Sequence, residues 1–264
     1  MKDINLFPHL LKSESIKFNA LDNNKYDLYI EEDSDVYSNI FIEGVNSNNV
    51  EININVKDYS ILHLLIFTRS IKSYVLNINL SKSSILYLTT SDSYTSNSQV
   101  DKNINILGEN VEVNVYEYVS QKDKLTTKGT FNLNHYAKNS ISKGKFMYLS
   151  KDTSFIDRDI VANIPGGMTN STSTESIKGL LLNEHSHIDA KPILKISLDD
   201  VHAAHGCAIG TIDSNEIYYL MSRGLTKEDA TKIICYSLIN PVLEATSDEE
   251  FKSLIKPYLE DSIS

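Results

Sequence analysis

The sequence has no tryptophan, five prolines and ten glycines among 264 residues, and its two cysteines are Cys207 and Cys235. Two cysteines do not resemble a disulfide framework or a paired-cysteine zinc site. No run of about 18 apolar residues could span a bilayer, and the N-terminus lacks the basic region and apolar core of a signal peptide. We therefore expect a soluble, unexported protein in the reducing cytoplasm, without membrane contact.

Basic residues are also scarce, since 25 Lys and Arg face 35 Asp and Glu and give a formal net charge of −10. Proteins that bind nucleic acid or anionic lipid use clustered Lys and Arg, so we expect neither as a partner. The chain also lacks the Gly-x-x-x-x-Gly-Lys-Ser/Thr pattern of a P-loop. It therefore has no P-loop ATP site of its own, and any ATP hydrolysis must come from another protein.

What the sequence does contain is a series of short segments in which apolar and polar residues alternate, from about residue 37 to residue 198. This period of two predicts β-strands, and the Ser, Asn, Asp and Lys clusters between them disfavour a parallel α/β fold with crossover helices. A sandwich, a barrel and a β-solenoid all fit, and Asn recurring beside Ile and Val is compatible with stacked solenoid rungs. Clear examples are Val50–Val56, Tyr74–Leu80, Val111–Tyr116 and Thr130–His135.

The pattern changes to helical spacing after Asp213. Gly224 is placed to end a first helix, and Thr226 followed by Asp229 predicts the start of a second helix that continues to Pro241. Residues 248–259 predict a third, shorter helix.

Four motifs follow one another in the last third of the chain: Asp189-Ala-Lys-Pro192, Asp199-Asp200-Val201, His205-Gly206 and Tyr218-Tyr-Leu-Met-Ser-Arg-Gly224. This series, from about Ser176 to Asn240, resembles the C-terminal core of the SufB/SufD family of iron-sulfur cluster assembly scaffolds, in a short, SufD-like form. The resemblance implies a mainly β fold, with a right-handed parallel β-helix over residues 36–212. It also implies a helical ATPase-docking region over residues 213–264. Residues 1–35 form a short N-terminal segment without an assigned role.

His205 is the strongest candidate for cluster assembly, because the resemblance aligns it with a His that lies between two scaffold chains in SufD-like proteins. The other interpretation is a hydrogen-bonded structural histidine. Cys207 stands where the family usually has Ala, and on a strand it would share a face with His205. A thiolate and an imidazole suit iron-sulfur ligation, although a small buried cysteine is an equally valid reading.

The family's sulfur-accepting cysteine corresponds to a position near Ile177, where this chain has no thiol. The chain therefore relies on another subunit for sulfur, uses Cys207, or has lost cluster chemistry. Glu184, His185, His187 and Asp189 crowd one segment, and Glu184 is a further candidate metal ligand, with a solvated polar rim as the alternative.

These features predict a non-catalytic scaffold that handles a transient iron-sulfur cluster. The implied partners are a SufC-like ABC-type ATPase, a second identical or SufB/SufD-like chain, and a sulfur donor. Two other hypotheses remain: a β-helix carbohydrate-active enzyme using Asp199, Asp200 or the segment at Glu184, and a structural module that docks the ATPase without cluster chemistry. The predicted ATPase contacts are Tyr219, Met221, Arg223 and Ile234.

Overall fold

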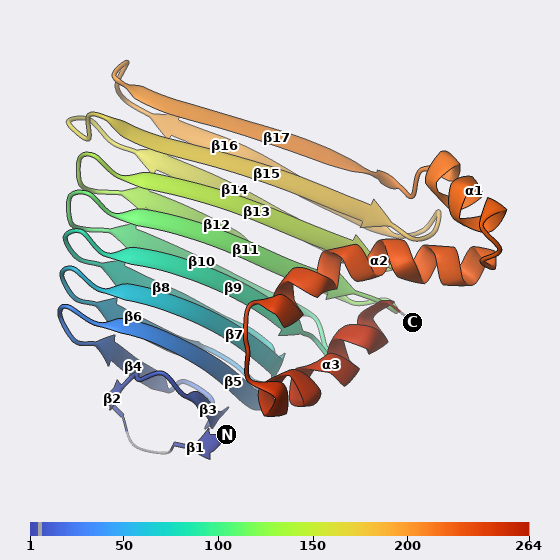
Figure 1. Ribbon diagram of the computed structural model, residues 1–264, viewed down its shortest axis with the longest axis horizontal. Helices are drawn as coiled ribbons and strands as arrows, with labels where there is room; N and C mark the ends of the chain where they lie inside the picture. The colour runs from blue at the N-terminus through green and yellow to red at the C-terminus, as the bar shows by residue number, and fades with distance from the viewer. Residues whose placement is uncertain (5–6, 264) are drawn as a thin grey trace.

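The computed structural model describes residues 1–4 and 7–263, apart from the side chain of Asn46. Within these residues the chain winds into a β-solenoid in which strands alternate between two parallel sheets (Figure 1). The predicted β-solenoid is confirmed. The nine-stranded sheet contains β1 (Lys2–Asp3), β3 (Ser15–Ala20), β5 (Asp35–Ser47), β7 (Ile61–Ile71), β9 (Ile85–Ser93), β11 (Glu112–Gln121), β13 (Ile141–Ser150), β15 (Ser171–Leu181) and β17 (Val201–Thr211). The eight-stranded sheet contains β2 (His9–Leu10), β4 (Lys25–Ile30), β6 (Val50–Val56), β8 (Ser73–Leu80), β10 (Ser98–Ile106), β12 (Thr126–His135), β14 (Phe155–Ile164) and β16 (His187–Ile196).

The solenoid includes residues on the N-terminal side of position 36. Strands β3 and β4 pair in parallel with β5 and β6, so the first described turns carry the same two sheets as the rest. Ile16, Leu28 and Ile30 are fully buried in the interior. The pairing continues from there to β16 and β17, which end the two sheets.

Asparagine and aspartate together explain how most of the turns form with so few glycines. Most of the corners contain a non-glycine residue in the left-handed region, with φ between 52° and 61°, and Asn and Asp tolerate this region better than other residues. Asparagines also form two ladders on the outer face of the eight-stranded sheet, in which each side-chain Nδ2 donates to the Oδ1 of the preceding rung at 2.8–3.3 Å. The ladders run along Asn53, Asn77, Asn103 and Asn132, and along Asn55, Asn79, Asn105, Asn134 and Asn163.

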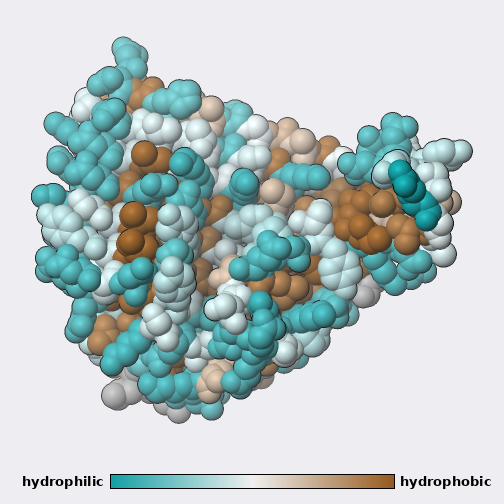
Figure 2. All heavy atoms as spheres, in the orientation of Figure 1, coloured by the Kyte–Doolittle hydropathy of each residue, from teal (hydrophilic) through white to brown (hydrophobic). Residues whose placement is uncertain are grey.

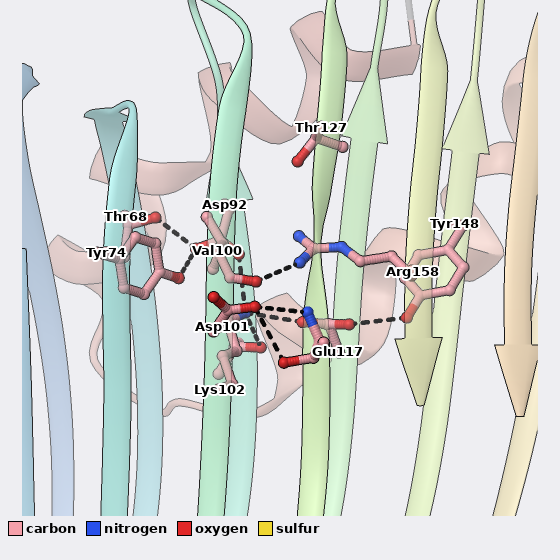
Figure 3. A network of polar contacts seen from close by, with 12 residues as sticks. Thr68, Tyr74, Asp92, Val100, Asp101, Lys102, Glu117, Thr127, Tyr148 and Arg158 are labelled. Atoms are coloured by element: carbon pink, nitrogen blue, oxygen red, sulfur yellow. Dashed lines mark hydrogen bonds and ion pairs between the residues drawn. The ribbon is translucent and has the colours of Figure 1, made fainter. Parts of the chain in front are cut away.

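The largely apolar interior contains a buried polar network of charged side chains between the sheets (Figure 3). At its centre, the Lys102 Nζ donates to Asp92 Oδ2 and Glu117 Oε1, both at 2.8 Å, and to Thr90 Oγ1 at 2.9 Å. Arg158 donates to the backbone oxygen of Val100 at 2.8 Å. The charged side chains come from β9, β10, β11 and β14, in both sheets, so they tie the two sheets and successive turns together.

Three helices follow the solenoid: α1 (Ser214–Ser222), α2 (Lys227–Glu244) and α3 (Glu249–Ile263). Helices α2 and α3 lie across the outer face of the nine-stranded sheet (Figure 1). They bury an apolar cluster there, and the Tyr116 hydroxyl donates to the backbone oxygen of Leu238 at 2.6 Å. The cluster joins Phe41, Leu65, Phe67, Tyr118, Leu149 and Leu180 to Cys235, Leu238, Ile239, Val242, Phe251, Ile255 and Leu259.

The predicted helix starts are confirmed, whereas the end at Pro241 is wrong. The Thr226 side chain accepts a hydrogen bond from the backbone N–H of Asp229, and Gly224 has a φ of +96°. Helix α2 continues through Pro241 to Glu244, because its last turn buries Val242 against the sheet. This packing offsets the hydrogen bond that proline cannot donate. Helix α3 likewise extends beyond residue 259, to the buried Ile263.

Candidate functional site

The candidate site lies on β17, the last strand of the nine-stranded sheet. Strand β17 pairs with β15 along one edge, and no other described strand pairs with its second edge (Figure 1). Most residues of β17 are exposed. An unpaired edge presents free backbone N–H and C=O groups, and such edges are templates for pairing with another strand. This end of the solenoid is therefore open.

The strand register places His205 and Cys207 on the inner side of this open end. Glu175 and Ile177 on β15 are opposite His205 and Cys207, respectively, and both point inward, with exposed fractions of 4% and 2%. Residues paired across parallel strands share a face of the sheet, so His205 and Cys207 continue two inward-facing columns. His202 is three residues from His205, so its side chain lies on the opposite, outer face of the strand, where it pairs with Thr172.

Cys207 is exposed, with its Sγ 3.7 Å from the backbone oxygen of Ala190 on β16. Partial burial raises the pKa of its thiol above the ordinary value. The thiol is therefore protonated at neutral pH, and it becomes a metal ligand only where a metal displaces the proton. Because Ile177 is opposite Cys207, the thiol stands one strand away from the position at which the family's cysteine was expected.

Glu175 is a further candidate that sequence reasoning missed. Its carboxylate is buried beside His205, and its Oε1 accepts a hydrogen bond from the Ser173 hydroxyl at 2.7 Å. Its Oε2 is buried without a hydrogen-bond partner. Burial raises the pKa of this carboxyl group, and the Ser173 hydrogen bond only partly opposes that effect. The alternation of Ser171, Ser173 and Glu175 along β15 was the available signal, but only strand pairing connects it to His205.

The structure does not bring Glu184 to His205. Glu184 and His185 are exposed in the turn after β15, beyond the level at which Leu181 pairs with Thr211. Thr211 lies six steps along the strand from His205, so Glu184 lies about 20 Å along the sheet from His205 at ~3.3 Å per residue.

The other candidates of this segment, His187 and Asp189, make separate contacts of their own. His187 lies against the Phe155 ring, with 5.1 Å between the ring centroids, and Asp189 pairs with Lys191 at 2.9 Å on the outer face. Across the described residues, no group of three His, Cys, Asp or Glu side chains could hold a metal ion. Asp199 and Asp200 are exposed in the turn between β16 and β17, where the backbone oxygen of Asp200 accepts a hydrogen bond from Asn170 at 3.0 Å.

The helical end carries a second candidate surface. Tyr219 and Met221 on α1 are 58% and 43% exposed, and the Arg223 guanidinium lies over the Tyr219 ring, 5.3 Å from its centroid. Ile234 instead packs partly against the helix–sheet cluster. Three further exposed residues that sequence reasoning did not select lie on the same two helices: Tyr218 on α1, and Ile233 and Tyr236 on α2. Figure 2 shows apolar side chains gathered at this helical end of the molecule.

The chain is therefore an open-ended parallel solenoid with a histidine and a thiol on its last strand, followed by an exposed helical surface. Residues 21–238 match the family described as SUF system FeS cluster assembly, SufBD core domain. The chain belongs to this SufB/SufD family, as its motifs predicted.

Individual relatives match shorter stretches. The iron-sulfur cluster assembly protein SufD of Bacillus subtilis is 33% identical over 103 residues, which cover 39% of this chain and 24% of the relative. SufD of Escherichia coli is 38% identical over 90 residues, 34% of this chain and 20% of the relative. A SufBD family protein of Pyrococcus horikoshii is 36% identical over 89 residues, again 34% of this chain and 20% of the relative. The matches thus span about a quarter or less of these relatives. In the described part of the chain, no helix has the length and apolar character needed to cross a membrane.

Proposed function

We propose that this chain is a non-catalytic scaffold subunit of a SUF-type complex, on which an iron-sulfur cluster is assembled and from which it is transferred. Membership of the family supports a role in SUF iron-sulfur cluster assembly. The observation that carries the finer proposal is the unpaired strand β17, with His205 and Cys207 on the inner side of the open end. Nitrogen and sulfur ligands suit iron-sulfur clusters. The cluster is the cargo of this scaffold, and a reducing cytoplasm fits its two free thiols.

A second scaffold chain would pair at β17. Parallel or antiparallel addition of its edge strand would satisfy the free backbone groups and enclose His205 and Cys207 between two chains. A second copy of this chain is the preferred partner, because two-fold pairing is the commonest closed symmetry, and a SufB/SufD-like chain is the alternative. Since Ile177 occupies the position near which the family's cysteine was expected, the sulfur would come from another subunit or through Cys207.

A SufC-like ABC-type ATPase would dock on the surface formed by Tyr218, Tyr219, Met221, Arg223, Ile233 and Tyr236. Exposed aromatic side chains, Met and Arg are the residue types enriched in interface cores. ATP-driven movement of the ATPase subunits would shift the two scaffold chains and expose the site at β17. In this scheme ATP hydrolysis belongs to the partner.

Anaerobic co-expression with the host's SufC-like ATPase tests the scaffold class. Affinity purification followed by light scattering should recover a complex that contains both proteins, with a mass that also reports the number of scaffold chains. Association without iron uptake would favour the structural module, and release of reducing sugar from an acidic polysaccharide would favour the carbohydrate-active enzyme. Absence of association would remove the proposed partnership.

Changing Tyr219 and Met221 together to serine should weaken ATPase binding by at least about 10-fold, because large, exposed side chains at the centre of an interface supply most of its affinity. Biolayer interferometry with the purified ATPase would measure the dissociation constant. Tyr59→Ser is a matched control, since Tyr59 is 49% exposed in a turn of the solenoid. Equal affinities of the double variant and the control would place the ATPase elsewhere.

His205→Ala should reduce the iron and sulfide recovered with the purified complex by about 10-fold or more, the range seen when the environment of a metal site is disrupted. ATPase binding and folding should be unchanged, because His205 lies on an exposed edge strand. His202→Ala removes the same ring from the outer face of the same strand and should retain its cluster. Equal iron contents in the two variants would contradict the role of His205.

A further inference from the structure

The inward-facing column that contains His205 holds a carboxylate with an unused oxygen. On successive strands this column runs from Val115 through Gly144 and Glu175 to His205. Glu175 is 4% exposed, and its Oε2 is buried without a hydrogen-bond partner. Glu175 has two neighbours in this column, Gly144 on one side and His205 on the other. Glycine has no side chain, so His205 supplies the neighbouring polar side chain.

The other oxygen of Glu175 is held from inside the solenoid. Its Oε1 accepts from the Ser173 hydroxyl at 2.7 Å, and the Ser173 and Ser142 hydroxyls are 2.7 Å apart. Ser142 lies 2.8 Å from Nε2 of the buried His135. Because Ser173 uses its proton on Glu175, Ser142 donates to Ser173 and His135 donates to Ser142. The chain of donors therefore ends at the carboxylate and fixes one oxygen while the second stays free.

A buried acceptor without a hydrogen-bond partner is unfavourable, and a buried carboxylate without one is more so. Such a group is retained where a ligand uses it, and the groups beside it define the ligand. An imidazole, a carboxylate and a thiol on two adjacent strands are ligands for a divalent transition metal such as Fe²⁺.

We propose that Glu175 is an iron ligand in this chain's half of the cluster-assembly site, with His205 beside it and Cys207 at the next inward position. This inference rests on the proposed scaffold function and deepens it by naming a ligand on β15. The described side chains do not form a complete metal site by themselves. The free edge of β17 is where a second chain closes the site around the metal.

Anaerobic titration of the chain with Co²⁺, followed by Fe²⁺ competition against a chelator, tests the proposal. We expect binding with a thiolate-to-cobalt absorption band, and both Glu175→Gln and His205→Ala should weaken it at least about 10-fold. Glu109→Gln removes an exposed carboxylate in a turn and should bind as the unaltered chain does. Glu175→Asp keeps the charge at a shorter reach and should bind with intermediate affinity.

Thermal unfolding separates a ligand from a structural residue. Glu175→Gln should unfold at the same temperature as the unaltered chain or higher, because it removes a poorly solvated charge. Loss of folding in this variant would show a structural role and overturn the proposal.

Two binding outcomes would also overturn it: no Co²⁺ binding by the unaltered chain, and full binding by Glu175→Gln. If His205→Ala alone weakens binding, Glu175 is excluded while the proposed site at β17 stands. The proposed function is judged separately, by ATPase association and cluster content of the co-expressed complex.

Discussion

Replacing Lys102 with methionine should lower the free energy of unfolding by about 3–5 kcal/mol, because removal of one partner from a buried ion pair leaves an uncompensated charge. Lys102 is 1% exposed and uses all three of its donors, two on the carboxylates of Asp92 and Glu117 (Figure 3). In the variant, both carboxylates would remain buried without the cation between them. Arg158 is nearby but donates to Val100 and Tyr94.

Urea unfolding followed by circular dichroism measures the effect. Lys178→Met is the control, since Lys178 is exposed on the outer face of β15. Adding Glu117→Gln to Lys102→Met should recover part of the loss, because one of the two uncompensated charges is removed. If Lys102→Met unfolded at the same urea concentration as the control, the buried ion pairs would not stabilise the solenoid.

The charges of this network balance within the protein interior. Burial raises the pKa of Asp92, but Lys102 and the hydroxyls of Thr68 and Tyr74 outweigh this effect, so the pKa lies below its ordinary value. Asp92 therefore stays ionised at neutral pH. Two carboxylates, one ammonium and one guanidinium leave no formal net charge, which allows a polar layer to persist between two apolar sheets.

The sequence carries much of the fold in local signals. Alternation of apolar and polar residues marks the strands, and Asn at the corners and on the outer face marks the rungs, as at Asn53 and Asn77. Neither signal specifies how a strand pairs, because a period of two is shared by sandwiches, barrels and solenoids. The choice came from the family motifs. The helix end predicted at Pro241 was wrong because the burial of Val242, a tertiary contact, outweighs the local helix-breaking effect of proline.

The candidate site was predictable only where it coincides with a motif. His205 and Cys207 were accessible from their order and alternation on one strand. Glu175 was not, because its relation to His205 depends on a register between strands 30 residues apart. Ile234, predicted as an ATPase contact, packs partly against the helix–sheet cluster, while the neighbouring Ile233 is exposed. Helical periodicity alone does not separate a core face from a docking face.

Lowering the pH from 6.5 to 4 should destabilise the fold by about 3 kcal/mol through His135 alone. His135 is fully buried, and its ring nitrogens lie 2.7 and 2.8 Å from the Ser140 and Ser142 hydroxyls. Burial lowers its pKa from 6.5 to about 4. The unfolded chain therefore takes up a proton below pH 6.5 that the folded chain takes up only near pH 4. Stability from this residue is complete above pH 6.5 and is lost as the pH falls through that window.

The difference between His135→Gln and the unaltered chain isolates this contribution, because the carboxylates common to both proteins cancel. Denaturant unfolding at half-unit steps from pH 7 to pH 4 should show the unaltered chain losing about 3 kcal/mol more than the variant, at about 1.4 kcal/mol per pKa unit. His185→Gln, in an exposed turn, should follow the unaltered chain. Parallel curves for His135→Gln and the unaltered chain would mean that His135 is readily protonated in place. His135 would then not be the neutral imidazole that donates to Ser142 at the start of the chain of hydrogen bonds leading to Glu175.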